Sequence, residues 1–88
     1  MKSDDTQISL SIYPNPATGN SIIISFPAVK EKATLEIYDV LGREVFSKEI
    51  AQGLTQLEIP ILQLPQGSYC AKIISGSIST IQKFEIIR

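Results

Sequence analysis

Three turn motifs, each with a tyrosine, interrupt this chain of 88 residues and constrain what it can fold into. Proline removes a backbone donor and fixes φ, and glycine accepts angles that other residues avoid, so each motif ends a regular element. The segments between them are short, and none shows a convincing 3.6-residue period. The motifs are Tyr13-Pro14-Asn15-Pro16, Tyr38-Asp39-Val40-Leu41-Gly42-Arg43 and Leu64-Pro65-Gln66-Gly67-Ser68-Tyr69.

The segments between the turns predict β-strands. Apolar residues recur at every second position, as at Ile8, Leu10 and Ile12, which is the period of a half-buried strand. Seven short strands with turns about every 8–12 residues predict an all-β, seven-stranded antiparallel Ig-like β-sandwich. The predicted strands are residues 8–12, 21–26, 33–38, 43–50, 54–59, 67–74 and 78–87, and residues 61–64 are predicted to form a tight apolar crossover.

Composition excludes several classes of function. The net charge is −1 without a basic block, which argues against nucleic-acid binding, and no apolar run approaches the ~18 residues that insertion into a membrane requires. With no histidine and one cysteine, zinc sites with histidine ligands, Ser-His-Asp triads and Cys-His dyads cannot form. The acidic residues are scattered without calcium-loop spacing, so we expect no metal, no cofactor and no enzyme.

The length corresponds to one domain. Residues 1–6 are acidic and polar, and we interpret them as a linker remnant ahead of a domain at 7–88. They lack the apolar core of a secretory signal.

The third turn motif predicts a specific hydrogen bond. A tyrosine near the start of a late strand in an Ig-like sandwich can bond its hydroxyl to backbone a few residues upstream. Here Pro65 and Gly67 form the turn and Tyr69 pins it; direct recognition by Tyr69 is the alternative. Alternation places Cys70 on the face opposite Tyr69 and Ala71, as a small packed residue rather than a nucleophile.

The first two turn motifs each allow a structural and a recognition role. Asn15 can cap its local backbone, and two prolines beside an aromatic can offer a polyproline-like docking surface. Asp39 and Arg43 can pair across their turn, where Gly42 takes a positive φ, and Tyr38 would complete a polar patch with them.

The last residues are the candidate recognition segment. They form either a final strand with solvated Lys83 and Arg88 or an accessible tail for a receptor. The candidate residues for recognition by a receptor are Lys83, Phe84, Glu85, Ile86, Ile87 and Arg88.

The order of these motifs resembles the C-terminal sorting domain (type A) of cargo proteins of the type IX secretion system of Bacteroidota. The resemblance covers residues 12–88. The family order is Tyr-Pro-Asn-Pro, Ile-Tyr-Asp-x-x-Gly-Arg, Leu-x-x-Gly-x-Tyr and a Lys-Phe strand ending in a basic residue. In this chain the second motif begins at Ile37, and the fourth, the C-terminal motif, is Lys83-Phe84 to Arg88.

The resemblance implies an address label rather than an enzyme. An Ig-like sandwich at the end of a larger exported protein would carry N-terminal cargo domains from the periplasm across the outer membrane by docking on the type IX translocon. A surface sortase-like peptidase would then remove it. An aliphatic residue is more usual in the family at the position of Cys70.

Two further hypotheses stay open. The domain could be an Ig- or fibronectin-III-like accessory module that binds carbohydrate or protein, although Phe26, Tyr69 and Phe84 are expected in the core and leave few aromatics for a binding face. A sorting signal should need residues 83–88 for export even if the fold survives without them. The first or last strand could also support weak self-association through an exposed edge.

Overall fold

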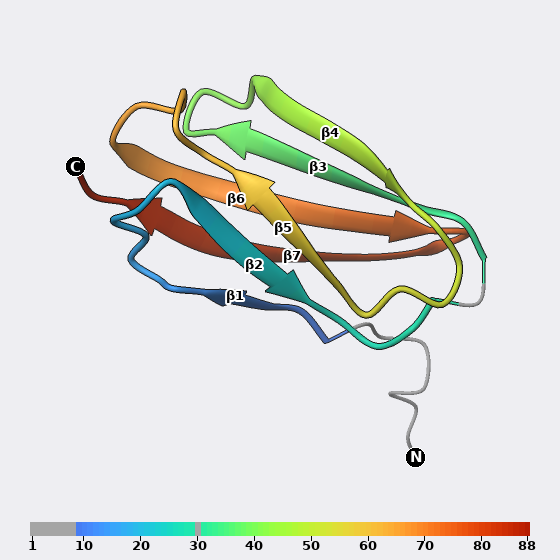
Figure 1. Ribbon diagram of the computed structural model, residues 1–88. Helices are drawn as coiled ribbons and strands as arrows, with labels where there is room; N and C mark the ends of the chain where they lie inside the picture. Colours follow the sequence, from blue (N-terminus) through green and yellow to red (C-terminus); the bar gives the residue numbers. More distant parts are fainter. Residues whose placement is uncertain (1–8, 30) are drawn as a thin grey trace, which may run out of the picture.

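Two antiparallel sheets make up the fold of the computed structural model, which describes residues 9–29 and 31–88 (Figure 1). The strands are β1 (Ser11–Tyr13), β2 (Ser21–Ser25), β3 (Ala33–Asp39), β4 (Glu44–Ile50), β5 (Gln56–Pro60), β6 (Gly67–Ser75) and β7 (Ile78–Ile86). One sheet has the order β1-β2-β5 and the other β4-β3-β6-β7. The predicted seven-stranded sandwich is confirmed.

Two strands begin later than predicted, and the other strand boundaries lie within one residue of the prediction. The first strand begins at Ser11 rather than Ile8, which lies outside the described residues, as does the predicted linker at 1–6. The fifth begins at Gln56 rather than Leu54, because residues 51–55 are exposed and form the turn into it. Within residues 9–29 and 31–88 there is no helix, and hence none that could cross a membrane.

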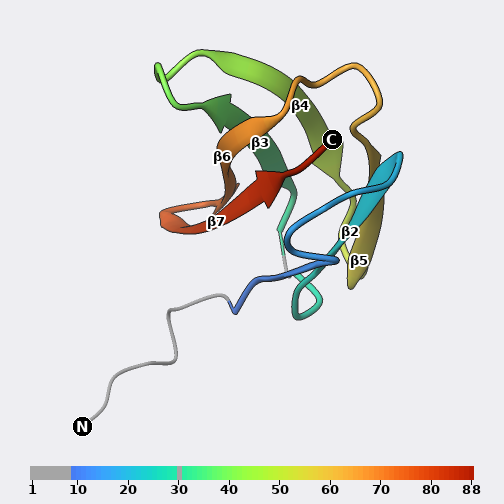
Figure 2. The ribbon, with the colours of Figure 1, turned by 90° about the vertical axis from the view of Figure 1, so that its left-hand side faces the viewer.

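The core lies between the two sheets, which Figure 2 shows from the end. Alternation explains it, because every second residue of β2, β3 and β6 points inward. Burying each large aliphatic side chain stabilises the fold by about 1.5–3 kcal/mol. The buried apolar residues are Ile12, Ala17, Ile22, Ile24, Phe26, Val29, Ala33, Leu35, Ile37, Ile50, Ile59, Ile61, Tyr69, Ala71, Ile73, Phe84 and Ile86.

Aromatic and crossover residues take the predicted places. Phe26, Tyr69 and Phe84 are buried, and the rings of Tyr69 and Phe84 stack with centroids 5.6 Å apart. Ile61 is buried at the start of the crossover, where the Leu64 N–H donates to the Ile61 carbonyl at 2.9 Å. The crossover therefore anchors β5 to the core before the chain enters β6 in the other sheet.

Candidate recognition groove

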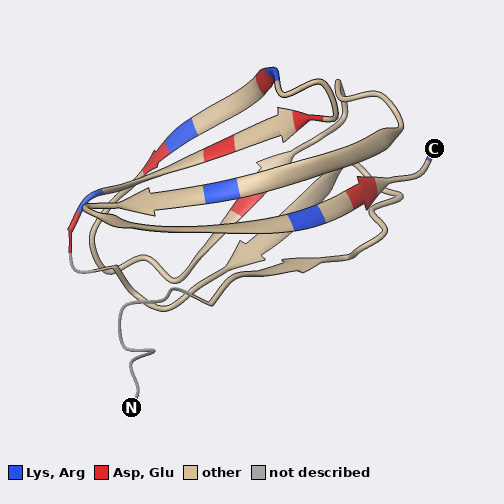
Figure 3. Cartoon of the chain, turned by 180° about the vertical axis from the view of Figure 1, so that it is seen from behind, with Lys and Arg blue, Asp and Glu red and all other residues tan. Residues whose placement is uncertain are grey.

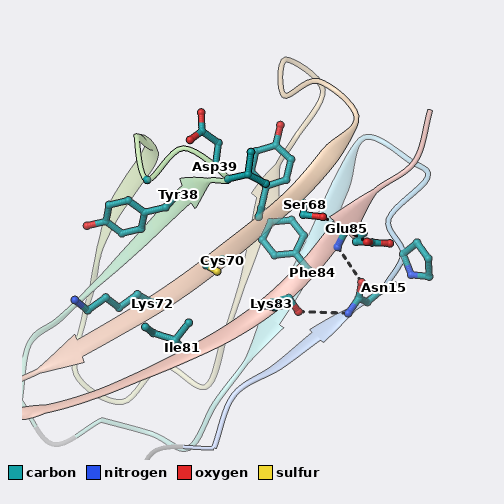
Figure 4. A pocket seen from close by; sticks show the side chains of 14 residues that line it. Asn15, Tyr38, Asp39, Ser68, Cys70, Lys72, Ile81, Lys83, Phe84 and Glu85 are labelled. Atoms are coloured by element: carbon teal, nitrogen blue, oxygen red, sulfur yellow. Dashed lines mark hydrogen bonds between the residues drawn. The ribbon is translucent and has the colours of Figure 1, made fainter.

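All four motifs meet at one open groove of about 800 Å³ on the outer face of the four-stranded sheet (Figure 4). Strand register explains this. Tyr38 of β3 pairs with Cys70 of β6, and Cys70 pairs with Lys83 of β7. The lining residues are Asn15 and Pro16 from the first motif, Tyr38, Asp39, Val40 and Gly42 from the second, Ser68 and Tyr69 from the third, Lys83, Phe84 and Glu85 from the C-terminal motif, and Cys70, Lys72 and Ile81 beside them.

Asn15 joins the first motif to the last strand. Its Nδ2 donates to the Lys83 carbonyl at 3.5 Å, and the Glu85 N–H donates to its Oδ1 at 3.1 Å (Figure 4). The Ala17 N–H donates to the Glu85 carbonyl at 2.7 Å, and the Ile87 N–H donates to the Ala17 carbonyl at 2.8 Å. The prediction that Asn15 caps its local backbone is wrong, because its side-chain amide bonds to the backbone of Lys83 and Glu85 in β7. The amide takes the place that a neighbouring strand would occupy beside these two residues. The amide thereby fixes one wall of the groove.

Asp39 organises the turn of the second motif. Its Oδ1 accepts hydrogen bonds from the backbone N–H groups of Leu41 at 2.9 Å and Arg43 at 3.0 Å, and its Oδ2 accepts from the Arg43 Nε at 2.9 Å. The predicted Asp39–Arg43 ion pair is therefore present, and Gly42 has the predicted positive φ, at 84°. Desolvation acts to raise the pKa of Asp39, but these hydrogen bonds and the Arg43 charge outweigh it and lower that pKa below its ordinary value.

Tyr38 lies half-buried beside that turn. Its hydroxyl donates to the Glu36 carboxylate. This hydrogen bond, followed by desolvation and the negative charges of Glu36 and Glu44, raises the pKa of Tyr38 to about 12. The phenol therefore stays a neutral donor at physiological pH.

Tyr69 makes the predicted corner. Its hydroxyl donates to the Pro65 carbonyl at 2.6 Å, four residues upstream. Burial, followed by the charge of Asp39, raises the pKa of Tyr69, while Arg88 acts in the opposite direction. Cys70 lies half-buried on the opposite face, as predicted, and borders the groove.

The six candidate recognition residues separate into two groups. Phe84 and Ile86 are each 1% exposed and belong to the core, whereas Lys83, Glu85, Ile87 and Arg88 are exposed. In the folded domain, direct contact with a partner is therefore open to the exposed four. Deleting residues 83–88 would also remove core side chains, so the fold cannot be held constant in such a truncation.

Arg88 is exposed but is not simply solvated, which corrects the prediction for this residue. Its guanidinium donates to the carbonyls of Gly19 and Leu64, each at 2.9 Å, and to that of Ile61. Its backbone N–H donates to the Gln66 Oε1 at 2.9 Å. Arg88 thus ties the turn at Gly19 and the crossover at 61–64 to the end of β7. Nothing in the local sequence signals this role, because the accepting carbonyls come from distant turns.

Two comparisons with known proteins complete the description of the groove. A family model described as a secretion system C-terminal sorting domain matches residues 11–87. The match includes all three turn motifs and the C-terminal motif up to Ile87. No curated protein is similar enough in sequence to be matched.

Proposed function

Because this chain belongs to the family of secretion-system C-terminal sorting domains, we propose that it docks through its groove on the type IX translocon and so carries N-terminal cargo across the outer membrane. The family itself is a sorting signal and not a catalytic one, and it implies export toward the outer membrane, the cell surface or the medium. Transit through the periplasm, and removal of the domain afterwards by a surface sortase-like peptidase, belong to the proposal.

One observation carries the docking role: four motifs that are far apart in the sequence border the same groove. The core and the turns would explain each motif alone, but not why polar side chains of all four border one space. The alternative of an accessory binding module has little support. Of the six aromatic side chains, all of them described, Tyr13 alone is exposed, so no aromatic platform for a sugar is present.

The test is an export assay. A fluorescent protein with an ordinary signal peptide is joined to the N-terminus of the whole chain and expressed in a bacterium that has the type IX system. The control is the same reporter without the chain. We expect the reporter outside the cell only when the chain is attached, and we expect its mass to show that the chain has been removed. Retention of both reporters would reject a self-sufficient signal, and export at full mass would reject the peptidase step alone.

A further inference from the structure

Within residues 9–29 and 31–88, one edge of β7 has backbone partners along its C-terminal half and none along the other half. The hydrogen bonds of Glu85 and Ile87 with Ala17 show that these residues direct their backbone groups away from β6. Because this direction alternates along a strand, Ser79, Ile81 and Lys83 direct theirs to the same edge. Asn15 binds the Lys83 carbonyl, but within residues 9–29 and 31–88 the outward groups of Ser79 and Ile81 have no partner. The described residues thus leave a row of backbone donors and acceptors unpaired beside the groove.

The other sheet edges carry features that discourage strand pairing. On β4 these are exposed Lys48 and Glu49 and a register irregularity opposite Ile37 and Tyr38. β5 ends in Pro60, which has no N–H, and β1 is three residues long. Charges, bulges, proline and shortness are the usual means of blocking an edge. Residues 78–82 of β7 contain no charge and no proline, and Ile81 is 59% exposed.

The side chains beside this open edge indicate the chemistry of a partner. In the strand register Ile81 lies next to Lys72, and both line the groove with Lys83 (Figure 4). Figure 3 shows basic segments on two neighbouring strands of this sheet, with acidic segments close by. Among the described residues, neither lysine forms an ion pair. Two acidic residues also line the groove, but Asp39 pairs with Arg43, and Glu85 accepts a hydrogen bond from the Ser68 hydroxyl at 3.4 Å. A second copy added at this edge would bring the same lysines together, whereas an acidic segment would be attracted.

We propose that the open half of β7 accepts an extended, acidic segment of the secretion machinery as an added strand. The proposal rests on the sorting function and assigns the contact that the translocon makes. Backbone hydrogen bonds to Ser79 and Ile81 supply affinity, and Ile81, Lys72 and Lys83 supply the preference for a segment with apolar and acidic residues. The segment continues along β7 from the place where residues 15–17 leave off.

Substitutions at Ile81 test the edge while the backbone groups that pair with β6 stay unchanged. Ile81→Pro removes an N–H that points outward, and Ile81→Glu adds a negative charge that repels an acidic segment. Val45→Glu is the matched control, since Val45 is also an exposed aliphatic residue on an edge strand of this sheet. All three are placed in the whole chain behind the fluorescent reporter. Thermal melting of the purified domains identifies any variant that does not fold, and Ile81→Glu keeps the test valid if the proline variant fails.

The expected result is export by the parent and by Val45→Glu. Folded Ile81→Pro should lose about two- to tenfold, which corresponds to one lost hydrogen bond, and folded Ile81→Glu should also lose export because its charge repels an acidic segment. Equal export of the parent and the Ile81 variants would overturn the added strand and leave the sorting function intact. No export by the parent would overturn both. Sedimentation of the parent at high micromolar concentration is the last arm. Dimers that Ile81→Pro and Ile81→Glu abolish would identify a second copy as the occupant and overturn the assigned partner.

Discussion

At the scale of single residues, three polar side chains hold the fold by hydrogen bonds to backbone, two of them at turns and one at the edge of β7. Asp39 closes the turn after β3, Tyr69 bonds the turn before β6, and Asn15 holds the free side of β7. Each replaces a backbone partner that the local chain does not provide. Such bonds matter because a buried or half-buried polar group without a partner costs more than the bond contributes.

Tyr69→Phe removes the corner hydrogen bond but keeps the ring that stacks on Phe84. We expect the free energy of unfolding to fall by about 1 kcal/mol, because the Pro65 carbonyl loses its donor. Guanidinium denaturation measures it. Tyr13→Phe is the control, since Tyr13 is exposed and its hydroxyl has no partner among the described residues. Equal stability of the parent and Tyr69→Phe would show that the corner bond does not stabilise the fold.

Asp39 makes stability depend on pH. Its pKa is lower in the folded state than the ordinary value of about 3.9, so the unfolded chain binds more protons between the two values. The contribution of Asp39 is therefore complete above about pH 4 and disappears as the pH falls through the folded-state pKa. We expect the difference in unfolding free energy between the parent and Asp39→Asn to shrink on acidification from pH 6 to pH 3. A difference that stays constant would contradict this assignment.

At the scale of elements, β7 combines two roles that the sequence presented as alternatives. Phe84 and Ile86 point into the core, while Lys83 and Glu85 face the groove. The final strand and the recognition segment are thus one element, which packs in the core with one face and lines the groove with the other. The hydrogen bonds of Arg88 to three carbonyls, one in the turn at Gly19 and two in the 61–64 crossover, extend the structural role past the end of the strand.

Two changes at the end of β7 should affect the thermal unfolding of the domain differently. Deleting residues 83–88 removes two buried side chains, each worth about 2–5 kcal/mol, from a domain whose total stability is about 5–15 kcal/mol. We expect that chain to lose its cooperative melting transition. The double substitution Ile87→Ala with Arg88→Ala leaves Phe84 and Ile86 in place and should still melt cooperatively, at a lower temperature. Cooperative melting of the truncated chain near the parent temperature would show that the end of β7 is dispensable for folding.

At the scale of the whole molecule, the sequence predicted the elements better than their contacts. Alternation identified β3 and β6 because period-two burial at Leu35, Ile37, Ala71 and Ile73 leaves a direct trace in the chain. Residues 83–88 also alternate, but their position at the end of the chain favoured a tail as strongly as a strand. Local patterns carry information about neighbours within a few residues, and the groove depends on longer distances.

The groove shows this limit most clearly. Asn15 bonds to residues 68 and 70 positions away, and the guanidinium of Arg88 reaches carbonyls 24 to 69 positions away. These contacts follow from which strands pair and how the two sheets are joined. The motif order indicated a family, but only the topology brings the four motifs to one surface.

The central claim is that this surface carries the sorting signal. The most direct test compares export of the reporter by the parent chain, Lys83→Glu and Lys48→Glu, after melting curves have shown that all three fold alike. Both lysines are exposed on edge strands of the same sheet, but only Lys83 lines the groove. The account predicts export by the parent and Lys48→Glu, and cellular retention of Lys83→Glu. Export of Lys83→Glu at the parent level, or equal loss in both variants, would contradict it.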